Sequence, residues 1–243
     1  MIVFNGCSFV EQSHLEMESL DWKSLYWPAL IATEHVNLAQ SGASNTRIWR
    51  TTIDHIHSGG DCTELYIGWT NIGREELPTA NGDILNCLPF SATLNSADAA
   101  KDNDLYISAT ELHKHWYKHH HNDWLSYERL LDYILTIQDA CAVRNIECWM
   151  FNSWDTNKLR IPRQLLTQNF NVLNDRLPWR WKKDLERVEN KIQNINFDKW
   201  IWSPNTHLLE WADSNNLERE PNGHPALSAQ RSIADYILQQ TRG

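Results

Sequence analysis

Four short segments carry the side chains whose types and spacing could do chemistry. Three of them follow apolar runs and one precedes the last predicted helix; they are Gly6-Cys7-Ser8, Ser41-Gly42-Ala43-Ser44-Asn45, Trp69-Thr70-Asn71 and Gly223-His224-Pro225. Sites in open parallel sheets form beyond the carboxyl ends of the strands, so a hydroxyl, a glycine, a carboxamide and an imidazole should converge there. These groups suit acyl transfer, because an imidazole titrates in the range needed to take the proton of a serine nucleophile.

The same segments offer donors for the oxyanion that acyl transfer produces. The backbone N–H groups of Ser8 and Gly42 and the side-chain amide of Asn71 supply three donors. A glycine at position 42 lets the backbone approach a ligand without a Cβ in the way. The sequence therefore predicts a nucleophile, a base and an oxyanion hole on one rim.

The four segments are held in place by predicted strands, which are short apolar runs, and by the predicted helices between them. The predicted strands cover residues 2–4, 36–39, 65–68, 146–151 and 200–202. The predicted helices cover residues 28–35, about 44 to the Gly59-Gly60 pair, 123–144 and 225–239. This alternation is typical of an α/β fold with a parallel sheet.

The chain of 243 residues is predicted to form a single domain over residues 1–243. Two stretches interrupt the alternation and are interpreted as insertions, at about residues 72–122 and 157–198. The first is polar and weakly periodic, which favours a long loop with little regular structure. The second is charged and helical in pattern.

The net charge, the lack of long apolar runs and the cysteine pattern exclude some classes of function. The formal net charge of -9 argues against a general nucleic-acid binder, which needs a basic face. No apolar run reaches the roughly 18 residues of a membrane span, and the first residues lack the pattern of a signal peptide. Five cysteines without a CxxC pair favour reduced thiols, so we expect a cytoplasmic protein.

The ordered motifs GCS (6–8), SGASN (41–45), WTN (69–71) and GHP (223–225) resemble the SGNH hydrolase superfamily, also called GDSL-like esterases. The resemblance covers residues 1–71 and 200–243. It implies a flavodoxin-like, three-layer α/β/α fold with a five-stranded sheet in the order 2-1-3-4-5. It also implies ester hydrolysis with Ser8 as nucleophile, His224 as general base, and Ser8, Gly42 and Asn71 around the oxyanion.

One departure from the family pattern concerns the acid that orients the histidine. The family places it three residues before the histidine, where this chain has Pro221. Glu220 lies one residue further back and is our candidate acid, the alternative being a backbone carbonyl that holds His224 in a Ser–His dyad. Trp69 and Arg74, beside the oxyanion asparagine, are candidates for substrate contact, since an Arg binds carboxylates and phosphates.

These inferences predict an esterase that hydrolyses ester or O-acetyl groups. Thirteen tryptophans favour a small-molecule or glycan ester as the partner, with neither nucleic acid nor a membrane. We expect no organic cofactor and no metal, although five histidines between positions 113 and 121 invite a metal interpretation. The basic aromatic run over residues 179–183 suits a solvated helix face, with glycan or nucleic-acid contact as its alternative.

The sequence is also compatible with a function that is not catalytic. The fold is compatible with a binding or structural module whose hydrolase site has decayed, and the proline in place of the acid motivates that alternative. The run WTNIGRE (69–75) resembles SGNH-like proteins encoded by tailed phages. That resemblance implies association with a virus particle.

Overall fold

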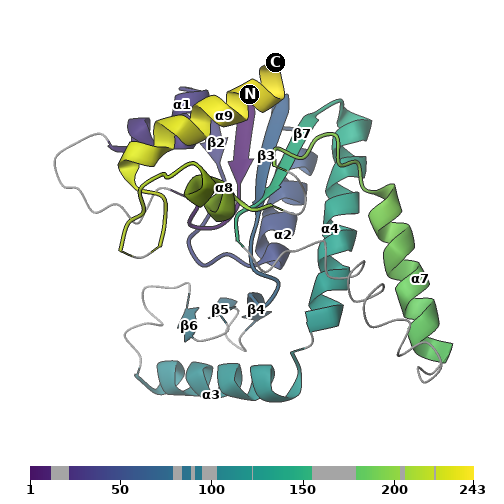
Figure 1. Ribbon diagram of the computed structural model, residues 1–243. Coiled ribbons are helices and arrows are strands. Elements are labelled where there is room, and N and C mark those ends of the chain that lie inside the picture. Colours follow the sequence, from purple (N-terminus) through teal and green to yellow (C-terminus); the bar gives the residue numbers. More distant parts are fainter. Residues whose placement is uncertain are drawn as a thin grey trace.

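A computed structural model gives the fold (Figure 1). It describes residues 1–11, 22–78, 84–88, 91–94, 103–121, 123–154, 179–202, 206–221 and 223–243. Its centre is a sheet of four parallel strands in the order β2-β1-β3-β7. The strands are β1 (Ile2–Asn5), β2 (His35–Asn37), β3 (Glu64–Trp69) and β7 (Glu147–Asn152).

Helices cover both faces of this sheet, so the fold is the three-layer α/β/α arrangement predicted from the sequence (Figure 1). One layer pairs α1 (Trp27–Ile31) with α9 (Gln230–Arg242), which follows the short 3-10 helix η5 (Leu227–Ala229). The other pairs α2 (Asn45–His57) with α4 (Asp123–Arg144). The strand order reverses between β1 and β3, where such folds bind ligands.

Two predictions for the edges of the sheet are wrong, one about where a strand begins and one about the last strand. Residue His35 begins β2 instead of ending the preceding helix. The predicted fifth strand, residues 200–202, is reduced to a single parallel bridge between Met150 and Trp200, followed by a second bridge between Asn152 and His207. The sheet order nevertheless continues in the predicted direction beyond β7.

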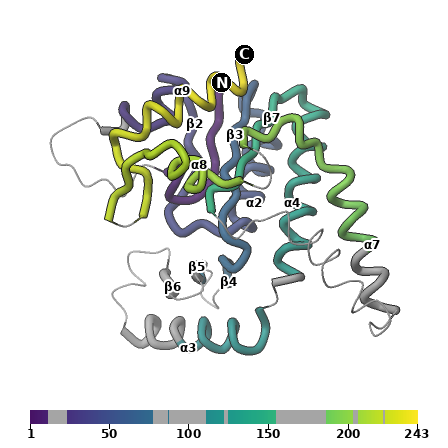
Figure 2. The backbone as a smooth tube through the Cα atoms, in the orientation of Figure 1, coloured from purple at the N-terminus to yellow at the C-terminus, as the bar shows by residue number. Residues whose placement is uncertain are grey.

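The prediction of little regular structure for residues 72–122 is also wrong. This stretch forms an antiparallel sheet of β4 (Glu75–Pro78), β5 (Ile84–Leu88) and β6 (Ser91–Leu94), followed by helix α3 (Asn103–His119). The buried Leu77 and Cys87 pack with Trp116 and Tyr117 of α3. Both views place this unit beyond the carboxyl ends of the central strands (Figure 2). We call it the insert.

The second predicted insertion contains one described helix, α7 (Trp179–Asn194), which packs along α4. Residues 155–178 lie outside the described residues. The side chains of the basic aromatic run over residues 179–183 also lie outside the described part of the structure. On α4, the nearly buried Glu128 receives hydrogen bonds from Arg187 and Lys191 of α7. Hydrogen bonding to Arg187, and then to Lys191, lowers the pKa of Glu128 to about 2.

Two glycines allow close packing where β1 and β3 end. A Cβ on Gly6 would lie 2.5 Å from Val10 Cγ2 and 3.0 Å from the carbonyl oxygen of Gly68. A Cβ on Gly68 would lie 2.7 Å from Ser153 Oγ and 2.8 Å from the ring of Phe151. These distances are shorter than van der Waals contact, so the sheet end can close only around glycines.

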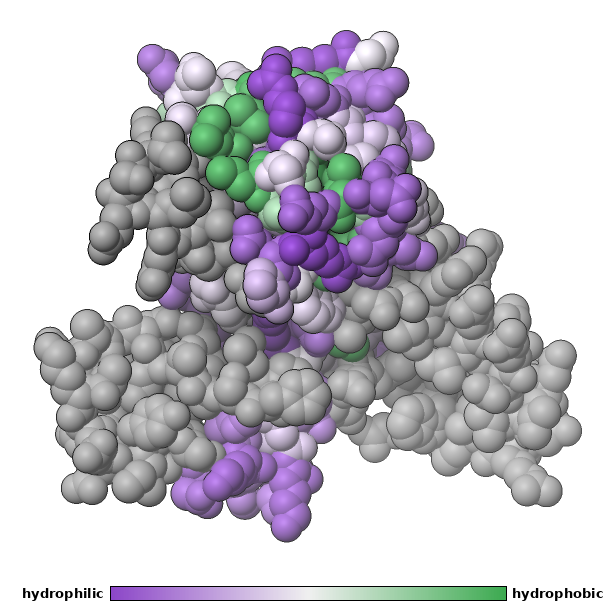
Figure 3. All heavy atoms as spheres, turned by 60° about the vertical axis from the view of Figure 1, so that its left-hand side comes forward, coloured by the Kyte–Doolittle hydropathy of each residue, from purple (hydrophilic) through white to green (hydrophobic). Residues whose placement is uncertain are grey.

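The described surface is mixed in polarity. On the face shown in Figure 3, apolar groups are interrupted by hydrophilic side chains. The exposed large apolar residues of the described chain are scattered along the sequence; they are Met1, Leu25, Leu112, Leu125 and Val143. None of the described helices combines the length and the apolar character needed to cross a membrane.

We expect Gly68→Ala to lower the free energy of unfolding by about 1–3 kcal/mol, because the added methyl group overpacks the end of β3. Urea titrations of the variant and the parent protein measure this difference. Gly60→Ala is the control, since its nearest neighbour is the side chain of His55 at 3.3 Å and the cost should be smaller. Equal stabilities for Gly68→Ala and the parent would contradict the packing argument.

Candidate active site

The centre of the site is a hydrogen bond between two residues 216 positions apart in the sequence. Nε2 of His224 lies 2.7 Å from Oγ of Ser8. Ser8 is 6% exposed and His224 is half-buried, so both groups sit at the edge of the core. The structure thus brings together the predicted nucleophile and the predicted base at the distance that proton transfer requires.

A tight turn after β1 positions Ser8. The carbonyl oxygen of Cys7 accepts hydrogen bonds from the N–H groups of Val10 and Glu11, both at 2.9 Å. The hydroxyl of Tyr26 donates to the carbonyl oxygen of Ser8 at 3.3 Å. Burial raises the pKa of Tyr26, which keeps this hydroxyl protonated and therefore a donor.

The carbonyl groups that follow Ser8 are fixed as well. Nε1 of Trp27 donates to the carbonyl oxygen of Phe9, and Nδ2 of Asn37 donates to that of Val10, both at 2.9 Å. Helix α1 and strand β2 therefore hold the same turn from two sides. This network fixes the backbone of the nucleophile before any ligand arrives.

A second tight turn positions His224. The N–H of Gly223 donates to the carbonyl oxygen of Glu220 at 2.8 Å, and Arg219 and Pro225 form an antiparallel bridge across the turn. Pro221 occupies the second position of this turn, which suits its fixed φ, and Gly223 has a φ of +86°. The proline that replaces the expected acid is therefore part of the turn that presents the histidine.

The ring of Phe9 also orients the imidazole. Its centroid lies 4.6 Å from that of His224, with the two planes tilted by 31°. Phe9 itself is 1% exposed and contacts Trp154 through an edge-to-face arrangement. Sequence reasoning missed this positioning role, although Phe9 directly follows the nucleophile and its aromatic type was the available signal.

Glu220 is joined to His224 through the backbone. Its N–H donates to the carbonyl oxygen of His224 at 2.8 Å. In the part of the chain that the structure describes, the Glu220 carboxylate has no hydrogen bond or ion pair with the imidazole. The structure therefore places the candidate acid in the turn of the histidine without bringing its carboxylate to the ring.

The segment after β2 carries Gly42 beside the end of β1. The N–H of Gln40 donates to the carbonyl oxygen of Gly6 at 3.2 Å, which ties the two segments together. Gly42 has a φ of +75°, a conformation that favours glycine. Among the described residues, neither the N–H of Ser8 nor that of Gly42 has an acceptor, so both remain able to bind an anion.

The side chain of Asn71 is held in one orientation. Its Oδ1 accepts the N–H of Gly73 at 2.7 Å, and its carbonyl oxygen accepts the N–H of Arg74 at 3.0 Å. A backbone N–H can only donate, so the atom facing Gly73 is the oxygen and Nδ2 points the other way. Within the described chain Nδ2 has no acceptor, which leaves the amide as a donor.

A reciprocal pair of hydrogen bonds links the Gly42 and Asn71 segments. Nδ2 of Asn45 donates to the carbonyl oxygen of Thr70 at 3.1 Å, and the N–H of Thr70 donates to Oδ1 of Asn45 at 2.9 Å. Both residues are buried. Sequence reasoning included Asn45 in its motif without this role; we call the two residues the Asn45–Thr70 clamp.

The two residues predicted to contact substrate differ in position. Trp69 is the last residue of β3 and is fully buried, so its side chain belongs to the core and not to an accessible surface. Arg74 is partly exposed, beside Asn71, and its Nη1 is buried without a hydrogen-bond partner in the described residues. Only Arg74 remains available for substrate contact.

No described group of three or more His, Cys, Asp or Glu side chains has an arrangement that could hold a metal ion. The histidines of α3, and His121 just after it, face different surroundings. Rings of His115 and His119 lie 4.6 Å apart, whereas His113 is buried and His121 lies 3.8 Å from the Glu75 carboxylate.

The sequence matches no known protein family and no curated protein. Among solved structures, the crystal structure of TesA has a similar fold, with 11% sequence identity and a TM-score of 0.48. The similarity covers 98% of this chain and 96% of that one.

Proposed function

We propose that this protein is a serine hydrolase of the esterase type, in line with the resemblance of its motifs to SGNH hydrolases. The observation that carries the proposal is the 2.7 Å contact between His224 Nε2 and Ser8 Oγ. A serine hydroxyl becomes a nucleophile when a neighbouring base takes its proton. The two unpaired N–H groups and the Asn71 amide beside this pair support the same reaction.

The proposed mechanism has two steps. His224 takes the proton of Ser8 as Oγ attacks the ester carbonyl, and the protonated imidazole then gives that proton to the leaving alcohol. An acyl group remains on Ser8. His224 then takes a proton from water as its oxygen attacks the acyl-enzyme, and the protonated imidazole returns that proton to Ser8 Oγ as the carboxylic acid leaves. In both steps the oxyanion lies among the N–H groups of Ser8 and Gly42 and the amide of Asn71.

A catalytically inactive binding module is the second candidate. The specific observation that favours it is the 6% exposure of Ser8, which leaves little room for a bulky acyl group. The first candidate requires turnover of a small ester, and the second requires none. A short-chain substrate therefore separates them.

We expect the protein to hydrolyse 4-nitrophenyl acetate, with kcat/KM falling by roughly 10³-fold or more in Ser8→Ala and in His224→Ala, because each removes one member of the reacting pair. Release of 4-nitrophenolate measures the rates. Ser228→Ala is the matched control, since that hydroxyl is exposed and bonded to Glu218. Hydrolysis that survives Ser8→Ala would assign the activity to another group, and no hydrolysis by the folded protein would favour the binding module.

We expect Asn71→Ala to lower kcat by about 10²-fold with a smaller change in KM, because an oxyanion donor acts mainly in the transition state. The same assay measures both constants. Asn215→Ala, whose amide bonds to the Trp211 carbonyl at the end of a helix, is the control. An unchanged kcat in Asn71→Ala would exclude the amide from the oxyanion hole.

We expect Glu220→Gln to keep kcat/KM within about threefold of the parent value. The reason is that the backbone turn and the Phe9 ring contact His224 whereas the Glu220 carboxylate has no bond to the imidazole among the described residues. Loss of an orienting acid costs about 10⁴-fold in a serine protease triad. A loss of that order in Glu220→Gln would instead make Glu220 the acid of a triad.

A further inference from the structure

Two arginines flank the segments that carry the oxyanion donors. Arg47 lies in the first turn of α2, where its N–H donates to Oγ of the N-cap residue Ser44 at 3.1 Å. Arg74 follows Asn71 and donates its N–H to the carbonyl oxygen of that residue. The Asn45–Thr70 clamp joins these two segments, so both arginines belong to the same rim.

Both guanidinium groups contain an N–H that is hidden from solvent and unused. Nε of Arg47 and Nη1 of Arg74 are buried without a hydrogen-bond partner. Neither arginine has a carboxylate within ion-pair distance among the residues that the structure describes. A half-buried cation without an acceptor is unfavourable, and buried donors of this kind ordinarily have a partner.

The described carboxylates near the two arginines contact other residues, although Oε1 of Glu76 is buried without a hydrogen-bond partner in the described part of the chain. Glu76 lies 3.3 Å from Arg50, and Glu75 accepts the hydroxyl of Ser126 at 2.8 Å. Glu11 accepts the N–H of Ser41. Charges on these acids act on Arg47 only from a distance: burial lowers the pKa of Arg47, and the Glu76 carboxylate opposes that effect. Among the described residues, no carboxylate therefore pairs with either arginine.

We propose that Arg47 and Arg74 form a subsite for an anionic group of the substrate, so that the preferred ester carries a carboxylate or a phosphate. This inference rests on the proposed esterase function, which it deepens by naming the substrate class. A planar guanidinium binds either anion through paired hydrogen bonds.

The kinetic test compares each anionic ester with a neutral partner. 4-Nitrophenyl hemisuccinate and 4-nitrophenyl butyrate have the same chain length, and only the first carries a carboxylate. 4-Acetoxyphenyl phosphate carries a phosphate on the alcohol side of its ester, and phenyl acetate is its neutral partner. We expect kcat/KM to favour at least one charged ester over its neutral partner by about tenfold, the effect of a charge-assisted hydrogen bond. Which pair shows the preference tells carboxylate from phosphate.

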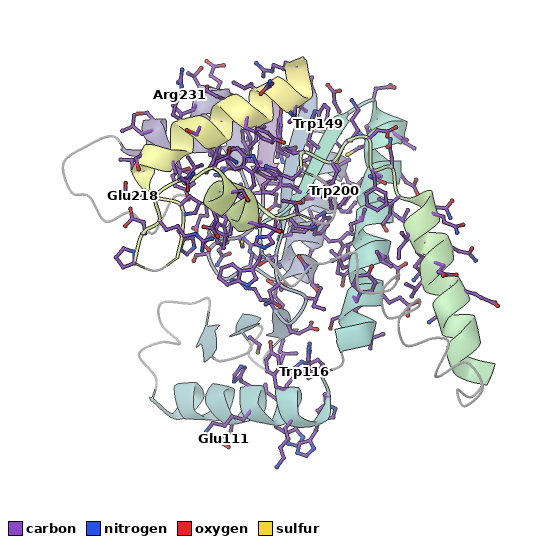
Figure 4. The ribbon with its side chains drawn as sticks, in the orientation of Figure 1. Glu111, Trp116, Trp149, Trp200, Glu218 and Arg231 are labelled. Atoms are coloured by element: carbon purple, nitrogen blue, oxygen red, sulfur yellow. The ribbon has the colours of Figure 1, made fainter. Side chains whose placement is uncertain are left out.

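The variants assign that preference to the two arginines. In Arg47→Gln, Arg74→Gln and the double variant, we expect the charged-to-neutral ratio to fall toward one through a higher KM for the charged ester. Arg47→Lys should restore part of the ratio because it restores the charge. Arg231→Gln is the control: this arginine pairs with Asp235 on α9, and Figure 4 places it far from the insert. A ratio of one in the parent, or a ratio that the variants leave unchanged, overturns the proposal.

A binding measurement tests the anion subsite separately from the proposed ester hydrolysis. Succinanilic acid and butyranilide are amide analogues of the first ester pair. Calorimetry with Ser8→Ala protein should show tighter binding of the acid, lost in Ser8→Ala/Arg47→Gln/Arg74→Gln. Thermal unfolding of each variant verifies that it is folded. Selective binding without any ester turnover would support the subsite and reject the esterase; turnover without charge selectivity in either measurement would do the reverse.

Discussion

The 2.7 Å hydrogen bond between Ser8 and His224 depends on the closure of the whole fold, because it joins the first strand to the turn before the last helix. Neither partner is placed by its sequence neighbours alone. Ser8 is fixed by Tyr26 and Trp27 at the start of α1, and His224 by a turn that packs its ring on Phe9. The contact therefore depends on the packing of α1 and α9, the two helices of one outer layer, against the sheet.

The glycines at the ends of β1 and β3 make this closure possible. Gly6 and Gly68 bring two backbones together at the point where the strand order reverses, and the clamp between Asn45 and Thr70 extends the contact to α2. The result is a rim on which two N–H groups and one amide have no acceptor among the described residues. In the proposed reaction the oxyanion is the acceptor for these donors, and the proposed anion subsite of Arg47 and Arg74 lies on the same rim.

The central α/β unit could be predicted from the sequence because its signals are local and strong. The continuous apolar run of β3 and the long apolar stripe of residues 123–144 leave few alternatives. The insert could not be predicted in this way. Its strands are four or five residues long and mixed in composition, and the buried Leu77 and Cys87 are covered by α3 from farther along the chain. The secondary structure of such segments is determined by tertiary packing and not by their local sequence.

The remaining differences between the predicted and the observed site concern the direction in which side chains point. Trp69 ends a strand that is buried on both faces, so the alternation of side chains could not tell whether its ring faces substrate or core. The orientation of Phe9 depends on Trp154 and His224, which are distant in the sequence, whereas the Asn71 amide is oriented by the neighbouring N–H of Gly73. Pro221 shows the opposite case: its type alone suits the turn that it forms, whereas comparison with the family pattern drew attention to the missing acid and to Glu220 as the candidate in its place.

The most direct test of the central claim uses a fluorophosphonate probe, which reacts with an activated serine, followed by mass mapping of the labelled residue. The account predicts a single phosphonylated residue, Ser8, in the folded protein. It also predicts that labelling slows as the imidazole of His224 is protonated at acid pH, because the protonated ring no longer accepts the serine proton. An unlabelled Ser8 in the folded protein, or a label on another serine, would contradict the proposed nucleophile and base.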